Sequence, residues 1–143
     1  MEADSILAPT EGSPCANTGI ERAIDVAADS GATLHALYVV DQGLGRPGDW
    51  DIVVERQEAE GEEALDAAGD LGERAGVEVE KHLRRGNPAQ EIVGFAEGNG
   101  VDVIVMGTCG RSGFDRIKTA GSTTERVIRA STVPVLAVPP ADE

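Results

Sequence analysis

The chain of 143 residues has the length of one domain. Hydrophobic residues make up 41% and charged residues 27%, a balance typical of a globular protein rather than a disordered tail. With 26 acidic and 12 basic residues, the net charge of −14 disfavours binding to nucleic acids and anionic lipid surfaces. The sequence shows no run of about 18 apolar residues and no secretory signal pattern, so it predicts a cytoplasmic protein without membrane insertion.

The charged residues have an unusual make-up. Lys81 and Lys118 are the only lysines among the 12 basic residues. An excess of Asp and Glu with scarce Lys resembles proteins of salt-loving organisms, whose carboxylates keep the surface hydrated under strong screening. We therefore interpret the acidic surface as a solvated surface of halophilic type rather than as a binding patch.

The chain begins with alternating extended and helical patterns. Ser5–Pro9 predicts a buried strand. Apolar residues then repeat along one face of a predicted helix over Asn17–Ser30, which Gly31 ends. Thr33–Val40 is rich in apolar and β-branched residues, as expected of a central strand.

The middle of the chain contains a loop, a long helix and a half-exposed strand. Segment 41–49 holds three glycines and a proline and predicts a mobile loop. A helix is predicted over Trp50–Ala75, in which Gly61 and Gly69 each cost about 1 kcal/mol relative to Ala. Alternating apolar and polar residues over Val77–Leu83 predict a strand near a sheet edge.

The last third repeats the alternation. Asn87 followed by proline predicts a helix start, and this helix extends to about Glu97. Val101–Met106 is the next predicted strand, and a helix is predicted over Ser122–Ala130. Val133–Val138 is the final predicted strand, and Pro134 and Pro139 are typical of a sheet edge.

This alternation of strands and helices predicts the fold class. The pattern is typical of a single-domain α/β protein, with an open parallel sheet and helices on both faces, as in Rossmann-like folds. Ligands of such sheets bind beyond the carboxyl ends of the strands, where the strand order reverses.

A glycine-rich segment follows the fourth predicted strand. It contains Gly107, Gly110 and Gly113, and the pair Gly121-Ser122 comes before the next helix. Glycine turns let backbone N–H groups approach an anion, and the positive end of a helix adds its field, so the pattern predicts a phosphate site. The spacing matches neither the dinucleotide fingerprint nor a Walker loop. Glycines that only turn a tight corner are the alternative.

The order of the motifs resembles that of universal stress proteins. Gly-x-x-Gly, a spacer and Gly-Ser/Thr are similar to the nucleotide loop of that family, with matching residues at 101–106 and 124–127 on either side. Segments 7–13, 86–93 and 133–138 resemble its opening strand and turn, the segment leading into its third helix, and its last strand. The resemblance covers nearly the whole chain and implies one nucleotide-binding domain over residues 1–143.

The resemblance also implies an architecture, a ligand and an assembly. It implies a five-stranded sheet in the order 3-2-1-4-5 and a homodimer joined through the last strand, Val133–Val138. It further implies binding of ATP, ADP or AMP, with Mg²⁺ as an accompanying ion. The residues carried over as nucleotide-binding are Pro9, Thr10 and Glu11 at the adenosine, Val39 at the adenine, and Met106, Gly107, Gly110, Arg111, Gly113, Gly121, Ser122 and Thr123 around the ribose and phosphates.

Two departures from the family pattern bear on this site. Glu11 stands where the family usually has Asp, and ten residues separate Gly110 from Gly121 where the pattern has nine. We interpret the extra residue as a small bulge, because Ser122 still makes a sound helix cap. The alternative is a dimeric interaction module of the same fold that has lost the nucleotide and signals through an unknown protein partner.

Catalysis is not indicated by the sequence. Phosphoryl transfer needs a positioned nucleophile and cations at the γ-phosphate, and only Arg111 offers such a charge. We therefore predict a regulatory binding protein of the stress response that is at most a slow ATPase. An enzyme with a separate substrate domain is disfavoured by the short chain.

The histidines and cysteines are few and far apart. His35 and His82 are isolated in strand-like runs, so each is interpreted as a packed or surface residue, and no metal site is predicted. Cys15 and Cys109 both follow the carboxyl ends of strands that are neighbours in the implied order. A reversible disulfide at the mouth of the nucleotide site is therefore a hypothesis, with two unpaired cysteines as its alternative.

Overall fold

Five parallel strands form one sheet in the order β3-β2-β1-β4-β5 within the part of the chain that the computed structural model describes, residues 3–12, 14–41, 50–108 and 123–139. The strands are β1 Ser5–Pro9, β2 Thr33–Asp41, β3 Val79–Gly86, β4 Val103–Gly107 and β5 Val135–Val138. The helices are α1 Pro14–Ser30, α2 Trp50–Ala75, α3 Pro88–Gly98 and α5 Thr123–Ala130. The α/β class, the parallel sheet and the implied strand order are all confirmed.

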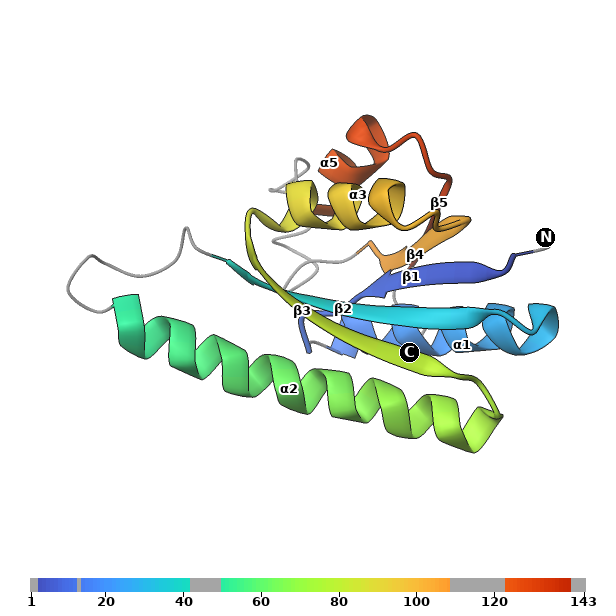
Figure 1. Cartoon of the computed structure of the whole chain (residues 1–143), viewed down its shortest axis with the longest axis horizontal. Coiled ribbons are helices and arrows are strands. Elements are labelled where there is room, and N and C mark those ends of the chain that lie inside the picture. The colour runs from blue at the N-terminus through green and yellow to red at the C-terminus, as the bar shows by residue number, and fades with distance from the viewer. Residues whose placement is uncertain (1–2, 13, 42–49, 109–122, 140–143) are drawn as a thin grey trace.

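The helices cover the sheet on both faces (Figure 1). Helices α1 and α2 pack on one face, and α3 and α5 pack on the other. Strands β3 and β5 are the two edges of the sheet. Both positions were predicted, that of β3 from its alternating apolar and polar residues and that of β5 from its prolines. No helix in the described ranges is long and apolar enough to cross a membrane.

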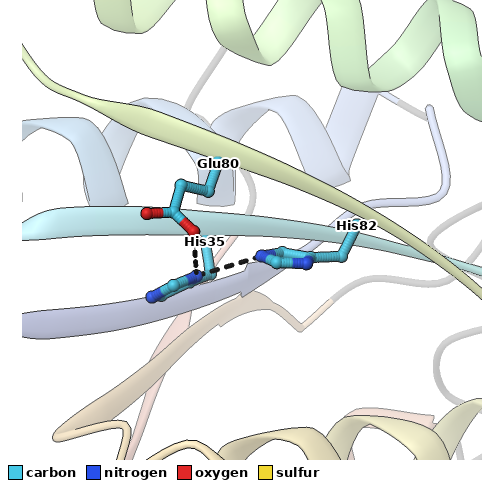
Figure 2. A group of neighbouring side chains, drawn as sticks. All are labelled: His35, Glu80 and His82. Atoms are coloured by element: carbon cyan, nitrogen blue, oxygen red, sulfur yellow. Dashed lines mark hydrogen bonds and ion pairs between the residues drawn. The ribbon is translucent and has the colours of Figure 1, made fainter.

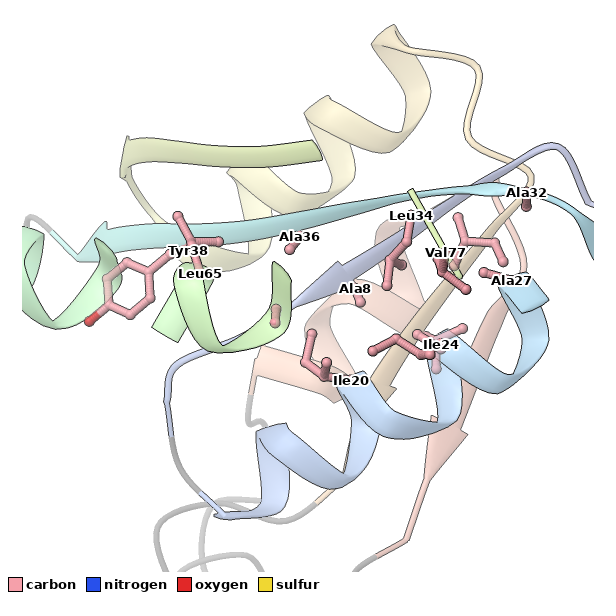
Figure 3. Close-up of a cluster of buried hydrophobic side chains, with 14 of the residues drawn as sticks. Ala8, Ile20, Ile24, Ala27, Ala32, Leu34, Ala36, Tyr38, Leu65 and Val77 are labelled. Atoms are coloured by element: carbon pink, nitrogen blue, oxygen red, sulfur yellow. The ribbon is translucent and has the colours of Figure 1, made fainter. Parts of the chain in front are cut away.

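The face under α1 and α2 carries the larger of two apolar cores (Figure 3). Ile20 and Ile24 of α1 point toward Leu34 of β2, and Tyr38 lies beside Leu65 of α2. The apolar residues predicted to share one face of the first helix are buried here. This core therefore follows directly from the helical periodicity of the sequence.

Two glycines of α2, Gly61 and Gly72, allow this helix to lie close to the sheet. A β-carbon on Gly61 would lie 2.6 Å from Cδ1 of Tyr38, and one on Gly72 would lie 2.3 Å from Cγ2 of Val79. A β-carbon on Gly69 would meet only the flexible end of the Lys81 side chain, Cε at 2.7 Å. Gly61, predicted only as a weak point of the helix, is therefore a position of close contact with β2, as Gly72 is with β3.

The face under α3 and α5 carries the second core. Leu7 and Leu37 from the central strands are fully buried there against Ile92 and Phe95 of α3 and Val127 of α5. Because β1 and β2 contribute to both cores, most of their residues are apolar and they do not alternate regularly with polar ones.

Several element boundaries differ from the predicted ones by a few residues. Helix α1 begins at Pro14 rather than Asn17, since proline is well suited to the first turn of a helix. Strand β3 begins at Val79, because the amide of Val77 donates instead to the carbonyl of Gly72 at the end of α2 (2.8 Å). Strand β5 begins after Pro134, which accepts a hydrogen bond from Ile104 but has no N–H to donate.

Two other predicted features have different outcomes. The start of α3 is confirmed, since the side chain of Asn87 accepts a hydrogen bond from the amide of Gln90 (3.1 Å) and Pro88 is the first helical residue. Of the loop predicted over 41–49, Asp41 belongs to β2, and residues 42–49 lie outside the described ranges.

Candidate functional site

The order of the sheet reverses between β1 and β4. Strand β1 has β2 on one side and β4 on the other, with Leu7 opposite both His35 and Ile104. The chain builds outward from β1 to β3 and then crosses over to β4. The carboxyl ends of β1 and β4 therefore form the edge at which parallel α/β proteins bind their ligands.

At the end of β1, Thr10 holds a tight turn. Its side chain is buried, its amide donates to the carbonyl of Leu37 (2.8 Å), and its Oγ1 accepts from the amide of Gly12 (3.1 Å). Gly12 has φ +82°, a conformation that favours glycine. The turn leaves the side chain of Glu11 exposed at the carboxyl edge of the sheet.

At the end of β4, Gly107 is held between two helices. Its carbonyl accepts a hydrogen bond from Oγ1 of Thr124 in the first turn of α5 (2.6 Å). A β-carbon on Gly19 of α1 would lie 2.9 Å from the Gly107 nitrogen, so that glycine lets α1 approach the strand end. The amide of Thr108 donates to Val138 (3.0 Å). The N-terminal parts of α1 and α5 thus lie at this edge, where their dipoles favour a negatively charged group.

The predicted nucleotide-binding residues divide into two sets. Pro9, Thr10, Glu11, Met106, Gly107 and Thr123 lie at or next to the carboxyl ends of β1 and β4, and Val39 lies on β2, two residues beyond Leu37, which pairs with Pro9. Met106 is buried in the core under α3. Outside the described ranges lie Gly110, Arg111, Gly113, Gly121 and Ser122 with the ten-residue spacer. The roles of both sets stay predictions.

The disulfide hypothesis also falls outside the described part of the chain. The structure describes neither Cys109 nor the side chain of Cys15. The proposed pairing of these two cysteines therefore stays a hypothesis.

Tyr38 is a buried titratable group near this edge. Burial against α2 raises the pKa of its hydroxyl, and the negative charges of Glu60 and Glu11 raise it further. Because Glu11 is one of the predicted adenosine-side residues, this phenol is sensitive to charge at the candidate site.

A second polar cluster lies on the other face of the sheet, away from the predicted residues (Figure 2). Nδ1 of His35 on β2 lies 3.0 Å from Nε2 of His82 on β3 and 3.7 Å from Oε1 of Glu80. Burial lowers the pKa of His82, the nearby His35 and Arg84 lower it further, and the charge of Glu80 opposes them.

His35 and His82 are 47 residues apart in sequence, and the sequence pattern did not predict this cluster. Both lie in predicted strands, and the implied order places those strands side by side. The adjacency of the two strands could therefore have indicated that the histidines lie near each other. It does not determine which residues of the two strands lie opposite one another. The β2–β3 pairing sets His35 opposite Glu80 and His82 two residues further along β3, on the same face.

The fold and this edge define a class of protein. A parallel sheet whose order reverses between two strand ends, each followed by a helix, is the architecture of α/β proteins that bind ligands at the switch point. Within that class the chain belongs to the universal stress protein family, whose sequence pattern matches residues 2–139.

Individual relatives agree with this assignment. The chain is 41% identical over 137 residues to a universal stress protein of Methanocaldococcus jannaschii, covering 93% of this chain and 80% of that protein. A solved universal stress protein from Lactobacillus plantarum superposes with a TM-score of 0.81 at 26% identity, covering 96% of this chain and 99% of the other. A universal stress protein solved in complex with cAMP has a TM-score of 0.79 at 26% identity, covering 99% and 100%.

Proposed function

We propose that this protein binds an adenine nucleotide at the carboxyl edge between β1 and β4 and acts as a regulator in the stress response. The observation that carries the proposal is that the Thr10 turn and the hydrogen bond from Thr124 to Gly107 lie at the ends of the adjacent strands β1 and β4, at the switch point of the sheet. Support comes from the structural neighbour that binds cAMP, which is itself an adenine nucleotide. ATP, ADP or AMP is the proposed ligand, with Mg²⁺ accompanying the phosphates.

Each part of the edge has a proposed task. The turn at Thr10 presents the exposed carboxylate of Glu11, which suits hydrogen bonding to ribose hydroxyls. Gly107 marks the end of β4 between α1 and α5, and we assign to it the position from which the chain enters the phosphate segment. The glycine-rich residues between Gly110 and Ser122 are the proposed phosphate cradle.

The proposed assembly is a homodimer through the C-terminal strand. Within the described residues, β5 pairs with β4 alone, and its Leu136 is 39% exposed. An unpaired apolar edge strand favours pairing with another chain, and a second copy satisfies it symmetrically. Sedimentation in high salt should show a dimer that Leu136→Lys dissociates, whereas a wild-type monomer at micromolar concentration contradicts this interface.

The proposed protein is a binding protein rather than an efficient enzyme. We also propose a binding protein that is at most a slow ATPase, because Arg111 is the cation that the sequence pattern offers at the γ-phosphate. The acidic composition is the basis for proposing a salt-loving source, and the cytoplasmic location is proposed separately, from the sequence pattern. The second candidate is a nucleotide-free interaction module, which Glu11 and the longer spacer favour.

Nucleotide release is the decisive experiment. The protein is purified in high-salt buffer without added nucleotide and denatured, and the released compounds are identified by chromatography and mass spectrometry. Adenine nucleotide near one per chain is expected. Glu11→Gln removes the edge carboxylate and Thr124→Val removes the hydrogen bond to the Gly107 carbonyl, so each should weaken ATP binding in calorimetry. Glu62→Gln on the exposed side of α2 should not weaken it.

Release of no nucleotide would contradict the proposal when it is combined with a second measurement. If no nucleotide is released and millimolar ATP leaves the melting temperature unchanged, the nucleotide proposal is wrong. The partner-binding module then becomes the better description of the same fold.

A further inference from the structure

We propose that His35, Glu80 and His82 form a binding site for a divalent transition-metal ion, with zinc as the reference ion, on the face of the sheet covered by α3. The site is separate from the nucleotide edge and does not depend on the proposed function. It is built from side chains of two neighbouring strands (Figure 2).

The distances between the potential ligand atoms suit one shared ion. Around a tetrahedral zinc ion with Zn–N distances of about 2.0–2.1 Å, two ligand nitrogens lie about 3.3–3.4 Å apart. Nδ1 of His35 lies 3.0 Å from Nε2 of His82 and 3.7 Å from a carboxylate oxygen of Glu80. One ligand atom from each of the three residues lies within 4.8 Å of the other two. Small side-chain rotations are therefore enough to surround one ion.

The donor set is one that zinc uses in proteins. Two imidazole nitrogens and one carboxylate oxygen provide three protein ligands and leave a fourth position for water. Both histidines can present a lone pair when the ring proton sits on the other nitrogen, so the contact between the two rings is compatible with a shared ion.

The sheet holds the three side chains in place. His35 lies directly opposite Glu80 in the parallel pairing, and Glu80 and His82 are alternate residues of β3. Alternate residues of a strand face the same side, so all three side chains project from one face with fixed spacing. Ligands on strands keep their geometry better than ligands on loops.

The surroundings provide a wall on one side and access on the other. The Phe95 ring of α3 lies 4.6 Å from the His82 ring and 5.6 Å from the His35 ring, measured between centroids. The His35 side chain is only 15% exposed, whereas that of Glu80 is 50% exposed. An ion can therefore enter beside Glu80 at the sheet edge, while Phe95 restricts the orientation of both rings.

This position distinguishes the metal site from the nucleotide edge. His35 lies opposite Leu7 in the middle of β1, whereas the nucleotide edge begins beyond Pro9. Mg²⁺ that accompanies a nucleotide prefers oxygen ligands, and a site with two imidazoles selects zinc or its transition-metal neighbours. Binding here would join edge strand β3 to β2 and stabilise the folded state by mass action.

Calorimetric titration with zinc tests the proposal. The Cys15→Ser/Cys109→Ser protein removes the thiols as competing ligands, and millimolar Mg²⁺ occupies the acidic surface. We expect one zinc ion per chain, a concentration-dependent rise in melting temperature, and visible absorption typical of tetrahedral Co²⁺ when cobalt replaces zinc. His82→Gln and His35→Gln should each lower the affinity by more than about 100-fold, beyond the effect of losing a supporting group.

Two further variants complete the test. Glu80→Gln keeps the size of the ligating side chain and should weaken zinc binding, whereas Glu62→Gln removes an equal charge from the exposed side of α2 and should not change it. Circular dichroism confirms that each variant is folded. Absence of zinc binding to the cysteine-free protein overturns the proposal. The proposal is also overturned if a folded His35→Gln, His82→Gln or Glu80→Gln variant binds zinc with unchanged affinity.

Discussion

The two faces of the sheet are built differently. Under α1 and α2, apolar side chains fill the core, and glycines of α2 bring that helix against β2 and β3. Under α3 and α5, the apolar core is smaller and a polar cluster of His35, Glu80 and His82 lies beside it. The α3 glycines, Gly94 and Gly98, are exposed to solvent and take no part in packing against the sheet. One face is thus specialised for close packing, whereas the other also accommodates polar side chains next to an edge strand.

The largest expected effect tests whether both faces are equally necessary. Leu34 and Leu37 lie on opposite faces of β2, and both side chains are fully buried. Leu34→Ala and Leu37→Ala should each lower the free energy of unfolding by about 2–5 kcal/mol, because each leaves a cavity in a core. Urea unfolding in high salt measures this. If only one of the two variants loses less than about 2 kcal/mol of unfolding free energy, the core on that face contributes little to stability.

The same substitution should have opposite effects in the two helices. Gly72→Ala in α2 places a β-carbon 2.3 Å from Val79 and 3.1 Å from the backbone oxygen of Val77. Overpacking of about 1–3 kcal/mol should outweigh the gain in helix propensity and destabilise the protein. In α3, exposed Gly94 has no neighbouring atom within 4 Å of such a carbon, so Gly94→Ala should stabilise by about 0.5–1 kcal/mol. Thermal unfolding measures the melting temperatures of both variants. If both melting temperatures shift in the same direction, the difference in packing between the two helices is contradicted.

A smaller effect is expected at high pH on the α2 face. Tyr38 is the only tyrosine of the chain, so its ionisation can be followed directly by ultraviolet absorbance. Its pKa should lie above the ordinary value of 10.0, chiefly because the hydroxyl is buried. Stability from this shift is present below pH 10.0 and is lost as the pH rises through the folded-state pKa. Glu60→Gln and Glu11→Gln should each lower the pKa of Tyr38, and an unchanged titration in both would contradict this placement.

The smallest effect is expected at mildly acidic pH on the opposite face. In the presence of a chelator, His82 should titrate below its ordinary pKa of 6.5, chiefly because of burial. The unfolded chain then binds more protons, so stability falls as the pH drops from 6.5 through the folded-state value. Glu80→Gln should lower the pKa of His82 further, whereas Arg84→Gln should raise it. Proton NMR of the two histidines resolves these shifts, and the reverse order of the two variants would falsify the proposed arrangement.

Most of the fold could be predicted from the sequence because its signals are local. Helix α1 follows from apolar residues that repeat along one face, and Asn87 followed by proline marks the start of α3. The apolar runs of β1 and β2 indicate strands buried on both faces, and the prolines beside β5 indicate an edge. The candidate nucleotide edge was found through family motifs, of which the structure describes the Thr10 turn and the Gly107 end.

Tertiary structure alone decided the features that depend on register and close packing. A period of two tells which residues of a strand share a face, but the offset between neighbouring strands depends on how the intervening helix packs. That offset placed His35 opposite Glu80 and beside His82, residues that lie far apart in sequence. Likewise, Gly61 and Gly72 gain their significance only from the rings and strands that they face. The sequence determined the elements and their order through local physics, whereas the fold determined which distant side chains meet.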